Sequence, residues 1–326
     1  MIKFIVKRLL ALIPVLIGVT LLVYFILDLA PGDPAKTILG EQARPEDIAA
    51  LREEMGLDDP FFVRYGRYMW DLVHGDFGTS YKTRDPVSEE ILARFPNTIK
   101  LTLTSTVVAI LLALPLGIIA AIKQNTLFDG ISMFISLIGI SMPVFWMGLL
   151  LILLFSVKLG WFPVSGADQG IKSLVLPSFA LGFMHMASIA RTTRSSMLET
   201  IRQDYIRTVR AKGLPEGEVI TQHALRNALI PTTTVIGLQI GGMLGGSVLT
   251  ESVFAWPGIG RYMIQSIQGR DIPSVMGCVI LLAISFALVN LLVDLVYGFI
   301  DPRIKAQYKY CLLYTSDAAD DRISVD

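Results

Sequence analysis

Side chains that could do covalent or metal chemistry are few and scattered. The 326 residues include two cysteines, Cys278 and Cys311, and three histidines, His74, His185 and His223, which stand far apart. The sequence has no Gly-x4-Gly-Lys-Ser/Thr phosphate loop, no His-Glu-x2-His zinc helix and no Gly-x-Ser-x-Gly nucleophile turn. We therefore expect no catalytic residue, no metal site and no cofactor bound by this chain.

Three polar side chains, His185, Asn290 and Asp294, interrupt otherwise apolar stretches. A polar residue inside a membrane segment is a functional candidate. Hydrogen bonding to a neighbouring helix would explain each of them equally well. The sequence leaves both interpretations open.

The polar segment 191–230 carries seven basic side chains. Gly213 is typical of a helix C-terminus and Pro215 of the first residue of a following helix, so the segment predicts helix, sharp turn, helix. We expect Gly213 to adopt a left-handed conformation that a side chain would oppose. Such a helix pair could bind anionic lipid or insert into a groove of a soluble partner.

Composition indicates what surrounds this segment. The chain is 53% hydrophobic and 17% charged, whereas soluble domains carry about 25% charged residues. The 28 Lys and Arg balance the 28 Asp and Glu, which gives no reason to expect nucleic acid as a partner. The composition is that of a membrane protein.

Six stretches are long and apolar enough to cross a bilayer as helices. They span residues 9–29, 99–122, 131–157, 174–190, 231–254 and 275–300. With the N-terminus in the cytoplasm, the short inner segments hold fourteen Lys and Arg and the short outer loops hold four. The positive-inside rule therefore places both termini in the cytoplasm.

The long outer segment, residues 31–97, predicts a small folded cap. One helix begins at Pro45, with acidic residues in its first turn, and closes at Gly56. An amphipathic helix follows over residues 61–73, with Phe61, Tyr65 and Tyr68 at helical spacing. These aromatic residues indicate either a small core or interface belt, or contact with an external partner.

Glycines recur every four residues in the fifth apolar stretch, at Gly237, Gly241 and Gly245, and again at Gly242 and Gly246. This spacing lets helix backbones approach closely. It predicts packing against another helix, either of this chain or of another subunit.

The 191–230 segment resembles the EAA loop of the membrane subunits of binding-protein-dependent ABC importers, in the dipeptide, oligopeptide and nickel branch. The likeness runs from residue 1 to about residue 309 through six other matching stretches. They are Pro31-Gly32-Asp33-Pro34, Gly56-Leu57-Asp58-Asp59-Pro60, Gly75-Asp76-Phe77-Gly78-Thr79-Ser80, Thr193-Arg194-Ser195-Ser196-Met197, Glu251-Ser252-Val253-Phe254-Ala255-Trp256-Pro257-Gly258-Ile259-Gly260 and Asp301-Pro302-Arg303.

The loop departs from the general family pattern at two places. Arg207-Thr208-Val209 replaces Glu-Ala-Ala, and His223-x-Leu225-Arg226 replaces Ile-x-Leu-Pro, with the proline later, at Pro231. We expect Asp204 to supply the acidic group. The residues that the resemblance assigns to ATPase coupling are Asp204, Arg207, Arg210, Ala211, Lys212, Gly213, Leu225, Arg226, Asn227 and Pro231.

The resemblance implies an all-α polytopic protein with six transmembrane helices and the type I ABC importer fold, in a bacterial inner membrane. Residues 1–30 would form the first helix and residues 98–309 the permease core. The implied partners are two ATPase subunits that use ATP and Mg²⁺, a second homologous permease, and an external solute-binding protein that meets the cap and the Trp256-Pro257-Gly258 loop.

Small peptides, either dipeptides, oligopeptides or glutathione, are the expected solute, and nickel is the alternative within the family. A secondary transporter or channel is the alternative outside it. After residue 309 the family pattern stops. Residues 310–326 resemble translated sequencing-adapter read-through and are predicted to be non-native, with a short disordered tail as the alternative.

Overall fold

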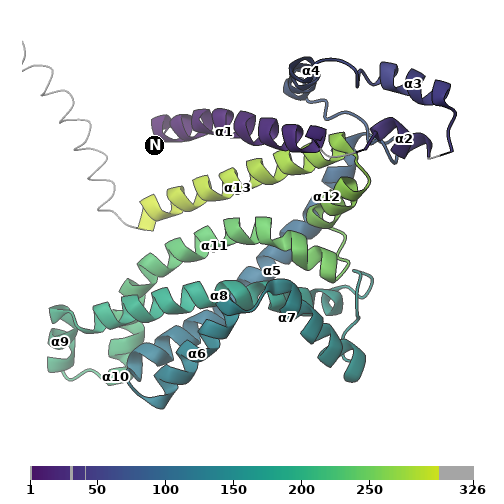
Figure 1. Ribbon diagram of the computed structural model, residues 1–326. Helices are drawn as coiled ribbons and strands as arrows, with labels where there is room; N and C mark the ends of the chain where they lie inside the picture. Colours follow the sequence, from purple (N-terminus) through teal and green to yellow (C-terminus); the bar gives the residue numbers. More distant parts are fainter. Residues whose placement is uncertain (1, 30–31, 41, 301–326) are drawn as a thin grey trace, which may run out of the picture.

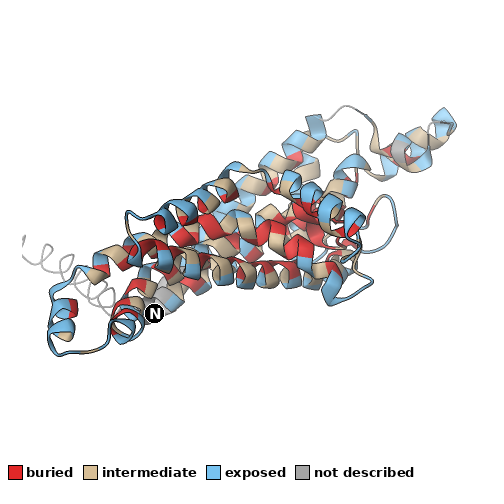
Figure 2. Cartoon of the chain, turned by 90° about the horizontal axis from the view of Figure 1, so that it is seen from below, coloured by how far each residue is buried: buried red, intermediate tan, exposed pale blue. Residues whose placement is uncertain are grey.

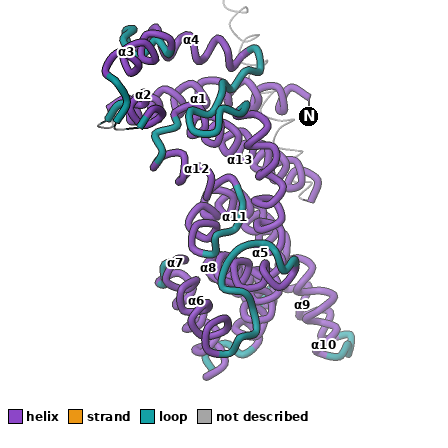
Figure 3. The backbone as a smooth tube through the Cα atoms, turned by 90° about the vertical axis from the view of Figure 1, so that its right-hand side faces the viewer, coloured by secondary structure: helices purple, strands orange, loops and turns teal. Residues whose placement is uncertain are grey.

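The computed structural model describes residues 2–29, 32–40 and 42–300, and these residues are folded almost entirely into helices (Figures 1 and 3). The elements are α1 (Ile2–Leu29), α2 (Pro34–Leu39), α3 (Pro45–Glu54), α4 (Phe61–Val73), α5 (Val87–Ile122), α6 (Leu127–Ser141), α7 (Val144–Leu151), the π-helical η1 (Ile152–Lys158), α8 (Ile171–Ile201), α9 (Asp204–Ala211), α10 (Glu216–Glu218), the π-helical η2 (Val219–Ala224), α11 (Leu225–Val253), α12 (Ile259–Gln268) and α13 (Ile272–Ile300). Residues 301–326, which contain the Asp301-Pro302-Arg303 stretch and the tail predicted to be non-native, lie outside the described residues.

Five helical stretches in the described residues are long and apolar enough to cross a membrane: α1, α5, α8, the α10 to α11 stretch and α13. The sixth apolar stretch is a bent pair, in which α6 and the α7–η1 helix meet at 105°, as in a broken span or a re-entrant loop. The expectation of one continuous helix over residues 131–157 is therefore wrong. Pro143 disfavours the helical region for Met142, which is extended with ψ of 121°, and the chain turns there.

Two sets of elements occupy opposite ends of the bundle (Figure 1). The short helices α9 and α10 lie at one end, which we call the α9 end, and α1 also begins there. The cap helices α2, α3 and α4 lie at the other end together with α12, and we call this the α12 end. The helical bundle between the two ends is the length of the α8 and α11 helices.

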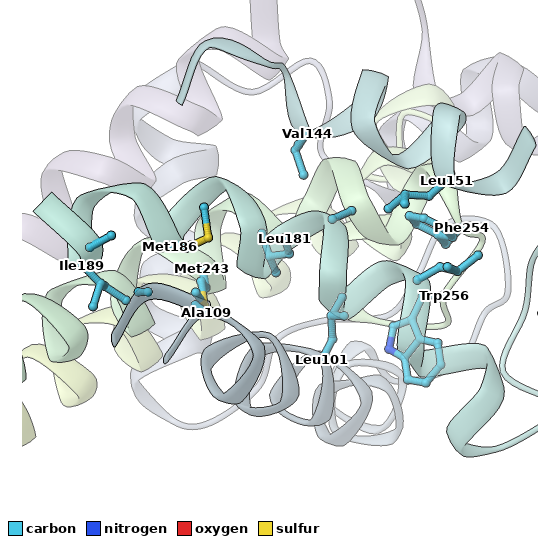
Figure 4. Close-up of a cluster of buried hydrophobic side chains, with 14 residues drawn as sticks. Leu101, Ala109, Val144, Leu151, Leu181, Met186, Ile189, Met243, Phe254 and Trp256 are labelled. Atoms are coloured by element: carbon cyan, nitrogen blue, oxygen red, sulfur yellow. The ribbon is translucent and has the colours of Figure 1, made fainter. Parts of the chain in front are cut away.

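The core sits where α5 packs against α8. Glycine makes the approach possible, because a Cβ at Gly182 would lie 2.6 Å from the carbonyl oxygen of Ser105, and one at Gly117 equally close to that of Ala190. Leu181, Met186 and Met243 are fully buried beside them (Figure 4). Burial runs along the middle of the bundle, while its sides are exposed (Figure 2). Large apolar side chains on those sides suit contact with lipid.

Helix α1 lies beside α13 at the margin of the bundle (Figure 1). Arg8 of α1 pairs with Asp294 of α13, with Nη2 and Oδ2 2.6 Å apart. The sequence left open whether Asp294 has a functional role or bonds to a neighbouring helix. This ion pair favours the bond to a neighbouring helix.

The cap contains the two helices expected from the sequence, α3 and α4, and a short helix, α2, that was not expected. The rings of Phe61 and Tyr65 lie 5.7 Å from that of Tyr24 in α1, measured between centroids, and that of Tyr68 lies 6.0 Å away. These aromatic residues therefore form the small core. The other side of α4 exposes Trp70 at 69% and Phe62 at 77%.

Candidate coupling site and helix interfaces

The expected helix–turn–helix in residues 191–230 is present at the α9 end. Helix α8 continues past its apolar part to Ile201, α9 follows after a short turn, and α10 with η2 leads directly into α11. Much of α9 and α10 is exposed, and the pair projects beyond the bundle (Figure 2). We call residues 204–224 the knob.

One apolar side chain anchors α9 to the rest of the molecule. Ile206 is fully buried and packs in a cluster with Val219 and Ala224 of η2. Met197 of α8 and Ala121 of α5 belong to the same cluster. With Ala228 of α11, the cluster connects α9 to the ends of three long helices, α5, α8 and α11.

The turn between α9 and α10 depends on glycine. Gly213 has φ of +82°, and its N–H donates to the carbonyl of Arg210 at 2.9 Å. This is the left-handed conformation expected from the sequence, which side chains other than glycine, asparagine and aspartate rarely adopt. Pro215 lies one residue before the helix rather than at its first position, because α10 begins at Glu216.

Two ion pairs stand on the surface of the knob. The Arg210 guanidinium donates to both Glu216 oxygens, at 3.1 and 2.6 Å, and so bridges the turn. This hydrogen bonding raises the pKa of Arg210. Arg207 meets Asp204 at 3.5 Å, but the two side chains are 75% and 95% exposed, so this pair contributes little to stability. The carboxylate of Asp204 thus remains accessible to a partner.

Tyr205 joins α9 to the start of α11, a role that sequence reasoning missed. Its hydroxyl accepts a hydrogen bond from the Asn227 amide at 2.7 Å, and the same amide donates to the carbonyl of His223 at 3.2 Å. Tyr205 is also 40% exposed on the outside of the knob. The signal available in the sequence was an aromatic residue between Asp204 and Ile206 at the start of α9.

The remaining predicted coupling residues fall into two groups. Ala211, Lys212 and Arg226 are exposed, the first two beside the turn and the third near the start of α11. Leu225 is half-buried against the Ile206 cluster, and Pro231 is an exposed residue within α11. The structure therefore brings most of the predicted set to one end of the bundle, around the α9 turn and the first two turns of α11.

The glycine pattern of α11 faces two helices of this chain. A Cβ on Gly237 would collide with Val293 of α13, and one on Gly241 would lie 3.1 Å from the Phe286 ring of α13. Gly242 and Gly246 approach His185 and Leu181 of α8. Packing within the chain thus explains four of the five glycines. Gly245 has no neighbour within 4 Å.

Comparison with known proteins shows which family the chain belongs to. A model of the binding-protein-dependent transport system inner membrane component matches residues 113–306, and the model of its N-terminal region matches residues 1–102. The chain belongs to this family.

Two relatives of the family show the likeness over their full length. The dipeptide transport system permease protein DppB of Alkalihalophilus pseudofirmus is 49% identical, over 94% of this chain and 100% of the relative. The glutathione transport system permease protein GsiC of Salmonella paratyphi A is 46% identical, over 94% of this chain and 99% of the relative.

The fold is shared with solved ABC transporters. The MetNI methionine ABC transporter in an inward-facing conformation superposes with a TM-score of 0.56 at 19% identity, over 65% of this chain and 96% of the other. The type I ABC importer fold expected from the sequence is confirmed. The chain is thus a multi-pass inner-membrane permease subunit.

At the α12 end of the permease, a buried carboxylate organises the family's Glu251 to Gly260 stretch. Glu251 is fully buried and accepts hydrogen bonds from the Thr98 hydroxyl at 2.7 Å and from the Arg261 N–H at 3.0 Å. A Cβ on Gly258 would collide with the same carboxylate. Glu251 therefore joins α5 and α11 to the first turn of α12. Glu251 is the first residue of a stretch that matches the family, but nothing in the sequence indicated its role.

A second buried carboxylate, Asp271, fixes the start of α13. It accepts from the Ser80 hydroxyl at 2.5 Å and from the Ser274 hydroxyl at 2.8 Å. The Tyr81 N–H donates to its other oxygen at 3.1 Å. Because Ser80 and Tyr81 lie between α4 and α5, Asp271 ties the last part of the cap to α13.

The loop that contains Trp256 was expected to meet an external partner, but the Trp256 side chain itself is buried. The side chain is 4% exposed and its indole N–H donates to the carbonyl of Asn97 at 3.0 Å. The Asn97 amide in turn donates to the carbonyl of Pro257 at 2.9 Å. An apolar ring this large is most favourable when buried, so the Trp256 side chain secures the loop against α5.

Proposed function

We propose that this permease imports small peptides, dipeptides or glutathione-like solutes, as the membrane subunit of an ATP-driven complex. The observation that carries this proposal is the 49% identity to a dipeptide permease along that relative's whole length. Relatives named for glutathione and for dipeptide transport match at 46% and 43%. Nickel remains the alternative within the family, and among the described residues no cluster of three His, Cys, Asp or Glu could hold a metal ion.

The complex that we propose contains two ATPase subunits, a second homologous permease and an external solute-binding protein. This chain binds no cofactor, and ATP with Mg²⁺ belongs to the ATPases. The α9 end and both termini face the cytoplasm. The support for this orientation is the concentration of arginine in residues 191–230, together with the start of α1 at the same end.

The knob is the coupling element in this proposal. Its exposed Tyr205, Arg207 and Lys212 contact a cleft of the ATPase, and the buried Ile206 cluster passes the movement on to α5, α8 and α11. A helix seated in a groove is a common mode of protein recognition. The exposed side of α4, with Phe62 and Trp70, is the surface of the cap offered to the binding protein.

Reconstitution tests this function. The tagged chain is co-expressed with the other subunits of its transport system, purified, and placed in liposomes with ATP inside and the binding protein outside. We expect the ATPases to copurify and labelled dipeptide or glutathione to be taken up only when both ATP and binding protein are present. Uptake without ATP would show a secondary transporter or channel, and uptake of Ni²⁺ alone would show the nickel alternative.

A further inference from the structure

One side of α11 is covered by no part of the described chain. Helix α11 lies between α8 and α13 (Figure 1). Between its contacts with these two helices runs an exposed stripe with helical spacing, formed by Pro231, Leu238, Gly242, Gly245 and Leu249. Leu238 and Leu249 are 54% and 50% exposed. Between the two leucines the stripe consists of Gly242 and Gly245, which lack the side chains that Leu238 and Leu249 project, and we call this low part of the helix surface the recess.

A polar pair borders this recess on the α8 side. His185 Nδ1 and Gln239 Oε1 lie 2.6 Å apart, and the histidine ring lies across Gly242 and Gly246, 3.4 and 3.8 Å from the Cβ positions these glycines lack. The other ring nitrogen, Nε2, has no hydrogen bond to any described residue. Both side chains are half-buried and stand near the middle of their helices.

A third polar side chain borders the recess on the α13 side. Asn290 Oδ1 lies 3.5 Å from the Cβ position of Gly241, at the same level of α11 as Gly242. Its amide makes no hydrogen bond within the described residues. We call the surface formed by Gly242, Gly245, His185, Gln239 and Asn290 the polar recess.

Contact with lipid does not account for the polar recess. Hydrogen-bonding groups left unsatisfied in hydrocarbon cost several kcal/mol each, so such residues face a cavity with water or another protein. By contrast, the exposed stripe of α5 is apolar from Leu103 to Leu111, with Leu103, Val107 and Leu111 at 55%, 55% and 66% exposure. The α5 stripe suits lipid, and the α11 stripe does not.

We propose that the polar recess contacts the peptide during its passage and forms part of the solute path. This inference rests on the proposed function. The side chains of the recess are uncharged hydrogen-bond donors and acceptors, and histidine, asparagine and glutamine can each do both. They match the amide groups that all peptides share. A contact without ion pairs is weak enough to release the solute, which translocation requires.

Thiol labelling tests whether water and solute reach the recess. In the full complex, with Cys278 and Cys311 replaced by serine, Gly245→Cys places a thiol on the floor of the recess, and Leu111→Cys places one on the α5 stripe as the control. A charged, membrane-impermeant methanethiosulfonate should label Gly245→Cys and leave Leu111→Cys unlabelled. Dipeptide with binding protein should slow the labelling of Gly245→Cys.

Absence of labelling at Gly245→Cys in an assembled complex would overturn the proposal, because the second permease would then seal this side of α11. Equal labelling at both positions would overturn it too. Because labelling does not require transport, its outcome is separate from that of the proposed function, which fails if the wild-type complex takes up no peptide.

Transport kinetics give the second test. His185→Ala should raise the KM for dipeptide uptake about fivefold to tenfold, since one neutral hydrogen bond is worth about 1 kcal/mol. His185→Gln, which keeps a donor and an acceptor, should restore most of the loss. An unchanged KM with a lower yield of assembled complex, in both variants, would show a bond that merely joins α8 to α11 and would contradict the proposal.

Discussion

The α12 end of the permease and the knob at its other end are attached to the bundle by different interactions. At the α12 end, the buried carboxylates of Glu251 and Asp271 join helix starts and loops by several hydrogen bonds each. At the α9 end, α6 and α8 are also joined by a buried carboxylate, because Asp129 accepts two hydrogen bonds from the Arg194 guanidinium, at 2.8 and 2.7 Å. The knob itself is attached by the apolar cluster around Ile206 and by the exposed hydrogen bond from Asn227 to Tyr205, and it carries its ion pairs on the surface.

This difference separates a rigid end from an adjustable knob. Buried polar networks are directional and tolerate little displacement, because each lost hydrogen bond leaves a desolvated group unpaired. Apolar contacts are non-directional, so a helix can pivot on them at low cost. The π-helical η2 is the last part of the knob and leads into α11, and π-helical turns are frequent at functional sites. The adjustable knob is the part that we propose receives the ATPase.

The largest effect should come from breaking the rigid end. Glu251→Ala leaves the Thr98 hydroxyl and the N–H of Arg261 without their acceptor, and we expect it to destabilise the purified protein by about 3 kcal/mol. Thermal unfolding in detergent, followed by size-exclusion chromatography, measures this loss.

A glycine pair provides a matched control for the same region. Gly258→Ala should also destabilise, because its Cβ would collide with the Glu251 carboxylate, whereas Gly217→Ala in the knob has nothing within 4 Å and should not. Equal unfolding temperatures for these two variants would argue against a tightly packed α12 end.

A smaller effect is expected at the anchor of the knob. Ile206→Ala creates a cavity in the buried cluster and should cost about 2 kcal/mol, at the low end for such cavities because the cluster lies at the end of the bundle. We expect α9 to detach, so that loaded binding protein no longer stimulates ATP hydrolysis in the reconstituted complex. Thr208→Ala, an exposed change in the same helix, is the control. Full stimulation in Ile206→Ala would mean that α9 does not pivot on this residue.

The smallest effect is expected at the surface of the knob. Arg210→Ala breaks the bidentate pair with Glu216, and exposed pairs are worth about 0–1 kcal/mol, so the unfolding temperature should fall only slightly. Arg207→Ala should leave it unchanged, since that pair is longer and more exposed. A large loss of stability in either variant would show that ion pairs, and not only the apolar cluster, attach the knob to the bundle.

Sequence reasoning reached those features that depend on local preference. The left-handed Gly213, the amphipathic α4 and the apolar spans all follow from residue types at fixed spacing. The bend after Met142 could have been inferred from Pro143, but a long apolar stretch on both sides favoured one helix. The burial of Glu251 was not predictable, because its partners Thr98 and Arg261 come from other parts of the chain and only the fold brings them together.

The same limit applies to the glycines of α11. Their spacing predicted close helix packing, yet it could not show that Gly241 faces α13, that Gly242 faces α8 and that Gly245 faces neither. These assignments depend on the positions of Phe286 and His185 in three dimensions.

The coupling role of the knob is tested most directly at Gly213. No atom lies within 4 Å of a Cβ placed there, so only the φ of +82° opposes a side chain. Asparagine tolerates this conformation and valine does not. The measurement is ATP hydrolysis stimulated by loaded binding protein in the reconstituted complex. We predict that Gly213→Val loses the stimulation while Gly213→Asn retains it, with both proteins inserted and assembled. Full stimulation in Gly213→Val would contradict the account.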